Sequence, residues 1–167
     1  MNHSKYSSAQ IALHWLSAFI ILWSLIAGSC VALFNVSEGA RLTFTALNIS
    51  LTTLFIPFFV VRVCLRVNHL CKYKFGAGEW LPTFVHNLIY LVTAIVLVTG
   101  VLMMNRPIVV FGWSATHQLI TNPHLLRGFH AAHQQSTAML GFLVVLHVLA
   151  VVKHEMGGNR ILKRMSF

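Results

Sequence analysis

The sequence combines ten histidines with very few charged residues, and several of these histidines fall inside long apolar runs. An ionisable side chain in hydrocarbon is energetically costly, so a histidine at membrane depth usually has a specific partner or a functional role. The histidines inside the runs are His14, His86, His133 and His147. Neutral imidazole is a good axial ligand for haem iron, which makes these four residues the candidates for redox chemistry.

The remaining histidines lie outside the apolar runs or near their ends, and we interpret most of them as solvated. They are His3, His69, His117, His124, His130 and His154.

The spacing of His133 and His147 indicates two levels on one helix face. The two residues are 14 positions apart, which is almost four whole turns and separates the side chains by about 21 Å. Two levels of imidazole on one face of a bundle would suit two stacked haems. The alternative interpretation of the same spacing is that His133 and His147 are two unrelated buried histidines, each held by hydrogen bonds.

Depth along the helices pairs His14 with His147. Both lie some 8 to 10 Å below the same membrane surface, at about 1.5 Å per residue, so they can hold one haem from opposite faces. His86 has nearly the same depth and ranks third, as a quinone partner, a hydrogen-bond partner of a haem propionate, or a group that supports a ligand.

At the other level His133 should face position 48, which is an asparagine. An amide is a poor ligand for haem iron, so this second site is defective, five-coordinate, or completed by His130, His117 or His124.

The elements that position these residues follow from composition. The chain has 167 residues, of which 57% are hydrophobic and 9% charged, and a soluble domain of this size cannot bury so much apolar surface. The apolar runs cover residues 10–34, 42–67, 81–104 and 129–152, and each is long enough to cross a bilayer as a helix. The sequence predicts an all-α transmembrane four-helix bundle forming a single membrane domain, residues 1–167. Pro57 predicts a bend in the second helix.

The positive charges predict the orientation. The chain has 12 Lys plus Arg against 3 Asp plus Glu, and an even number of helices places nine of the basic residues on the side of both termini. Those nine are Lys5, Arg62, Arg66, Lys72, Lys74, Lys153, Arg160, Lys163 and Arg164, against Arg41, Arg106 and Arg127 on the other side. Both termini are therefore expected in the cytoplasm. The basic balance is a topology signal, so no nucleic-acid partner is expected.

Two further features depend on this topology. Two roles explain three of the basic residues equally well: they are either partners of haem propionates or ordinary topology determinants. These residues are Arg62, Arg66 and Lys153.

The connection 105–128, with Trp113, is expected to be an interfacial loop with an aromatic anchor.

Several motifs occur in order along nearly the whole chain. They are Gln10-Ile11-Ala12-Leu13-His14-Trp15-Leu16, Val60-Val61-Arg62-Val63 with Arg66, His86-Asn87-Leu88-Ile89-Tyr90, Gly100-Val101-Leu102-Met103-Met104, and His147 to His154 leading into Asn159-Arg160-Ile161-Leu162-Lys163-Arg164-Met165. With these motifs the chain resembles the prokaryotic cytochrome b561 family.

The resemblance implies a multi-pass b-type cytochrome of the bacterial inner membrane, surrounded by lipid. It would hold haem b non-covalently and carry electrons of the respiratory chain to or from the quinone pool. The family's four ligand positions correspond to His14, Asn48, His133 and His147, so the metal ligands present here are His14, His147 and His133. Because Asn48 departs from the pattern, one haem is expected, at His14 and His147, and a second is in doubt.

Three functions remain open at this stage. Some relatives look like superoxide oxidases, so the first is a stand-alone oxidoreductase that links superoxide or another donor to quinone. His86, His154 and Glu155 are its candidate proton acceptors. The second is a cytochrome b electron-carrier subunit that docks a redox partner protein within a larger dehydrogenase or hydrogenase complex. The third is a haem-free membrane protein that retains the scaffold.

Overall fold

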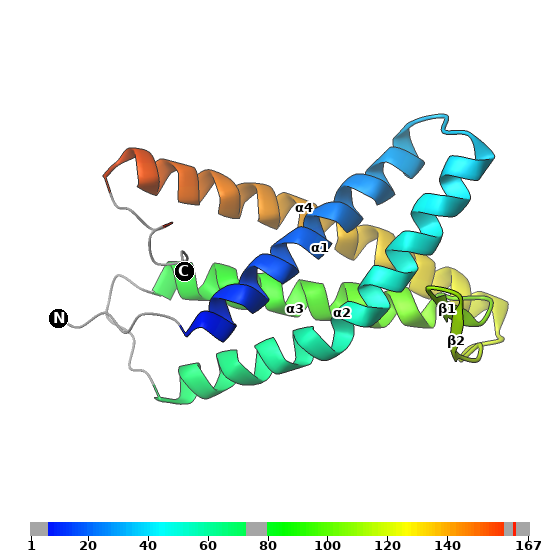
Figure 1. Cartoon of the computed structure of the whole chain (residues 1–167), viewed down its shortest axis with the longest axis horizontal. Helices are drawn as coiled ribbons and strands as arrows, with labels where there is room; N and C mark the ends of the chain where they lie inside the picture. The colour runs from blue at the N-terminus through cyan, green and yellow to red at the C-terminus, as the bar shows by residue number, and fades with distance from the viewer. Residues whose placement is uncertain (1–6, 73–79, 159–161, 163–167) are drawn as a thin grey trace.

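The computed structural model describes residues 7–72, 80–158 and 162. Its four long helices are α1 (Ser8–Leu33), α2 (Glu38–Lys72), α3 (Trp80–Leu102) and α4 (Pro123–Met156) (Figure 1). All four are long and apolar enough to cross a membrane. Large apolar side chains point outward, as at Phe19, which is 63% exposed, and such a surface suits lipid rather than water. The predicted fold class, a four-helix membrane bundle, is confirmed.

α2 and α4 extend beyond their apolar runs at both ends and α1 begins two residues earlier than its run, whereas α3 ends at Leu102, two residues before the end of its run. α1 begins with a capping box in which Ser7 Oγ accepts from the Gln10 N–H at 3.3 Å and Gln10 Oε1 accepts from the Ser7 N–H at 3.0 Å. α4 begins at Pro123 instead of residue 129, since Asn122 caps it by accepting from the His124 N–H at 2.9 Å. Hydropathy reports only the embedded part of each helix.

α2 is one continuous helix with Pro57 inside it. Its course changes direction near the middle (Figure 1). Proline lacks the N–H of a helical hydrogen bond and crowds the preceding turn, which accounts for the predicted bend.

The bundle consists of two helical hairpins. α1 packs along α2 and α3 packs along α4, whereas α2 meets α3 over a shorter stretch. One buried cluster, Ile20, Phe55 and Phe59, and a second, Val92, Leu140 and Leu143, fill the middle of the bundle, and Ile21 packs against both. This apolar middle layer lies between the two ends of the bundle.

The connection between α3 and α4 contains a small β-hairpin that was expected only as a loop. β1 (Ile108–Val110) pairs antiparallel with β2 (Trp113–Thr116). Phe111 (φ 46°) and Gly112 (φ 89°) form its turn, and two successive positive φ values are the geometry that tight hairpins favour. Trp113 is 82% exposed, as an interfacial anchor would be.

The beginning of α1 and the end of α4 lie at the same end of the bundle, opposite the β-hairpin (Figure 1). Some residues used to predict orientation and family lie outside the described residues. They are Lys5, Lys74, Arg160, Lys163 and Arg164, together with His3 and most of the motif from Asn159 to Met165.

Candidate functional site

Polar side chains gather at two depths of the bundle. We call the set near the start of α1 the terminal level, comprising His14, Arg62, Arg66, His86 and His147. The set near the β-hairpin is the hairpin level, comprising Asn48, Thr99, Gly100 and His133. Each level draws residues from several helices, and the apolar middle layer lies between the two.

The terminal level brings together three histidines from three helices, as the depth argument predicts. His14 comes from α1, His86 from α3 and His147 from α4. The rings of His86 and His147 are in contact. Arg62 of α2 lies against both His14 and Tyr90, which is one turn from His86 on α3. His14 belongs to one helical hairpin and His147 to the other.

His86 lies next to His147 at the terminal level. The two imidazole rings are in direct contact, with centroids 5.2 Å apart and an interplanar angle of 63°. Two axial imidazoles on one haem iron have ring centroids about 6 Å apart, so a porphyrin would fit between these rings only after they moved apart by about 1 Å. His86 is therefore a direct neighbour of His147 within the terminal level.

Arg62 determines where His14 carries its proton. An Arg62 Nη2–H lies 3.0 Å from His14 Nδ1, and a guanidinium can only donate. His14 Nδ1 is therefore the acceptor, so the proton of the neutral ring is on Nε2. The Arg62 guanidinium also stacks over the Tyr90 ring, 5.2 Å from its centroid, which holds it inside the bundle.

Arg66, one turn further along α2, has incomplete hydrogen bonding. Its Nε donates to Asn87 Oδ1 at 3.2 Å, while its Nη2 is buried without a partner. Within the described part of the chain the only ion pair is Arg41 with Glu38, at the other end of α2. These two partly buried guanidinium groups have no carboxylate partner among the described side chains, and their donors are suited to an anion.

The sequence reasoning left the role of these two arginines open and missed their contacts with His14 and Asn87. Their i, i+4 spacing on one helix face was the signal that could have paired them with the histidines.

The hairpin level holds His133 in a defined tautomer. His133 Nδ1 lies 3.1 Å from the Val96 carbonyl oxygen and 3.3 Å from Thr99 Oγ1. Because a carbonyl only accepts, Nδ1 carries the proton and Nε2 keeps its lone pair. Metal-bound histidines usually have this arrangement, with the other ring N–H donating to a backbone carbonyl.

Gly100 provides the space for this ring. A Cβ at position 100 would lie 3.2 Å from His133 Cε1, which is closer than comfortable packing allows. Sequence reasoning did not identify Gly100 or Thr99 as part of the site, although Gly100 stood at the start of a quoted motif.

Asn48 supplies an amide at this level. Its Oδ1 is buried and has no hydrogen-bond partner, so a polar group faces the interior without being satisfied. The candidate substitutes His117, His124 and His130 are all exposed, and His124 Nδ1 accepts from Arg127 Nη2 at 3.1 Å. The structure therefore places none of the three in the bundle interior with His133.

The described residues contain no cluster of three or more His, Cys, Asp or Glu side chains with the geometry of an all-protein metal site. A haem needs fewer protein ligands, because the porphyrin supplies four of the iron's ligands and the protein only the axial ones. Imidazoles at one depth on two helical hairpins, beside a pair of arginines, are a donor set that fits this group.

Four membrane-spanning helices with imidazoles at two depths of the bundle define a membrane protein of the b-type cytochrome class. The family model described as prokaryotic cytochrome b561 matches residues 5–167, nearly the whole chain. The chain belongs to the prokaryotic cytochrome b561 family. A search of curated proteins finds no significant match. Membership implies a membrane electron-transfer protein that binds haem b.

Proposed function

We propose that the chain holds one haem b at the terminal level, between His14 and His147, and uses it to exchange electrons with the quinone pool. The observation that carries the proposal is that histidines from both helical hairpins lie at one depth of the bundle beside a buried arginine. Arg62 donates to His14 and stacks over Tyr90 of α3, and His147 is in ring contact with His86. A haem with two histidine ligands supplies a one-electron centre without an open coordination position, which suits outer-sphere transfer.

The protein's own residues orient this site. Coordination through His14 Nε2 requires the imidazole proton to be on Nδ1, and that nitrogen now accepts from Arg62 at 3.0 Å. Arg62 must then turn to another acceptor. Haem propionates are carboxylates, and carboxylates are the acceptors that both Arg62 and Arg66 lack among the described side chains.

Quinone chemistry requires groups that exchange protons near the electron-transfer centre, because quinol oxidation releases two electrons and two protons. His86 is the best placed of the sequence candidates, since its ring contacts His147 directly. His154 is exposed, and Glu155 Oε2 accepts from the Leu162 N–H at 3.2 Å. We assign His86 the role of quinone or ligand partner and leave the other two as interfacial groups.

We expect an anaerobic quinol to reduce the haem of the purified protein. The reduced-minus-oxidised visible spectrum should show a low-spin b-type centre, and dithionite should set the full extent of reduction. If dithionite reduces the haem and quinol does not, quinone exchange is wrong and the electron-carrier subunit becomes the better assignment. A colourless protein would reject haem binding altogether.

Superoxide is the second donor for the same assay. Two superoxide anions would give up one electron each to reduce one quinone, with uptake of two protons, and would leave as two molecules of dioxygen. Quinol formation driven by superoxide, with haem reduction by superoxide when quinone is left out, and both prevented by superoxide dismutase, would make the protein a superoxide:quinone oxidoreductase.

The orientation is also part of the proposal, with the protein in a bacterial inner membrane and both termini in the cytoplasm. The positive-inside rule counts nine basic residues on the terminal side against three on the hairpin side. Reporter fusions after Phe167 and within residues 105–128 should report opposite sides of the membrane. Two reporters on the same side would contradict this orientation.

A further inference from the structure

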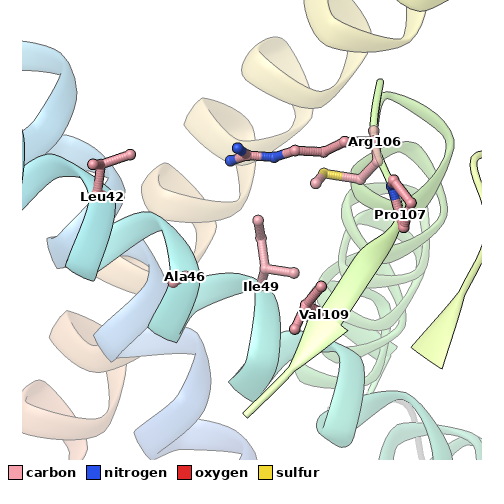
Figure 2. Close-up of a pocket in the computed structure, with 7 residues that line it drawn as sticks. Leu42, Ala46, Ile49, Arg106, Pro107 and Val109 are labelled. Carbon is pink, nitrogen blue, oxygen red and sulfur yellow. The ribbon is translucent and has the colours of Figure 1, made fainter. Parts of the chain in front are cut away.

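A pocket of about 300 Å³ lies at the hairpin end of the bundle, away from the histidines of the terminal level. Leu42, Ala46 and Ile49 of α2 form one wall (Figure 2). The segment that follows α3 forms the other wall, with Met104, Arg106, Pro107 and Val109. The lining is thus apolar except for one guanidinium.

The two walls are joined by hydrogen bonds to a buried serine. Ser50 of α2 is only 4% exposed. Its Oγ accepts from the Phe111 N–H at 3.1 Å and donates to the Val109 carbonyl oxygen at 3.5 Å. Ile108, at the start of β1, is also buried. The β-hairpin is therefore attached to α2, and the pocket between them is a built feature of the fold.

Arg106 gives this pocket an uncompensated positive charge. Its side chain extends across the pocket toward α2 (Figure 2). The other two arginines predicted on this side both have partners, because Arg41 pairs with Glu38 at 2.8 Å and Arg127 donates to His124 at 3.1 Å. Among the described residues Arg106 contacts no carboxylate and makes no side-chain hydrogen bond.

The position of the pocket matches the headgroup region of a bilayer. Leu42 lies in the second turn of α2, and Arg106 follows the end of α3 at Leu102 by four residues. At such a depth a guanidinium meets phosphate groups, while apolar side chains below it meet the start of the acyl chains. Leu42 and Val109 are about half exposed, so the pocket opens toward lipid.

We infer that this pocket binds the phosphate and glycerol region of an anionic phospholipid. The guanidinium of Arg106 donates to the phosphate, for which its planar fork is well suited. Leu42, Ala46 and Ile49 contact the beginning of one acyl chain. Free phosphate shares the headgroup chemistry but makes no contact with this apolar wall. In a zwitterionic lipid the headgroup cation lies beside the phosphate and weakens its attraction to Arg106.

Native mass spectrometry of the detergent-solubilised haem protein tests the assignment, with phosphatidylglycerol and phosphatidylcholine as probes. The unmodified protein should retain phosphatidylglycerol in preference to phosphatidylcholine. Arg106→Gln should weaken that retention by about tenfold, equivalent to about 1.4 kcal/mol. Arg127→Gln removes the same charge from the same side of the protein away from the pocket, and it should leave retention within about twofold.

A second pair of variants tests whether the space in the pocket is needed for lipid binding, independently of the charge of Arg106. Ala46→Trp fills the pocket and should abolish retention although Arg106 is intact, whereas Ala138→Trp, at an exposed position on α4, should not. Each variant must keep the haem spectrum of the unmodified protein, which reports the folded bundle.

Three results would overturn the inference. Equal retention of the two lipids would show that charge is not recognised, and equal losses in Arg106→Gln and Arg127→Gln would show a general charge effect. Displacement of phosphatidylglycerol by millimolar inorganic phosphate would show that the pocket recognises the anion without its chain.

Discussion

His147→Ala and His14→Ala are each expected to yield protein without the low-spin haem of the terminal level. Each substitution removes one of two axial nitrogen ligands, and alanine offers no donor in its place. Loss of a partner that only supports a metal ligand weakens binding about 10- to 100-fold, so loss of a ligand itself should cost at least about 100-fold in haem affinity. Pyridine haemochrome quantitation per mole of protein measures the loss, and the visible spectrum reports the coordination state.

His86→Ala is the matched control for these two variants. It removes an imidazole that lies at the same depth and contacts His147 directly. In the proposed site, however, this imidazole is not the one that lies across the porphyrin from His147. We expect this variant to retain six-coordinate low-spin haem. Retention of such haem by both His14→Ala and His147→Ala would make the ligand assignment wrong, and His86 would then be the first substitute to consider.

Asn48→His is expected to raise the haem content from about one to about two per chain. The hairpin level already provides His133 with Nδ1 directed to the Val96 carbonyl at 3.1 Å and Nε2 free to coordinate. What it lacks is a second imidazole, because Asn48 offers a buried oxygen that no group satisfies. An imidazole at position 48 restores the ligand that the family pattern has there.

Two further variants test whether the gain has this cause. Asn48→Gln keeps an amide and should remain at about one haem per chain, whereas Asn48→His combined with His133→Ala should lose the added haem. The new centre should also appear as a second step in a redox titration. A stoichiometry of two in the unmodified protein would contradict the assignment of the hairpin level as the deficient site.

Much of the architecture could be predicted from the sequence because the bilayer imposes a simple constraint. Every backbone polar group must be satisfied within hydrocarbon, so long apolar runs become helices. A fixed rise per residue then places His14 and His147 at one depth and His133 at another. The helix ends were predicted less well. α4, for example, begins at Pro123, because hydropathy does not detect an N-cap residue such as Asn122.

Relations between helices depended on the tertiary structure. Periodicity gives the angle between two residues of one helix, but the rotation of each helix in the bundle follows from packing, here around Ile20, Phe55 and Phe59. Depth alone therefore left His14 and His86 as rivals. Only the structure shows that the rings of His86 and His147 are in contact, with centroids 5.2 Å apart.

The sequence by itself determined four membrane-spanning helices, the family, the two depths of imidazole and the absence of a histidine at position 48. Only the tertiary structure decided that Arg62 donates to His14, that Gly100 makes room for His133, and that Ser50 attaches the β-hairpin to form the Arg106 pocket. The physical reason is that hydrophobic burial and helical rise act along the chain. A hydrogen bond of about 3 Å instead depends on which faces of separate helices meet.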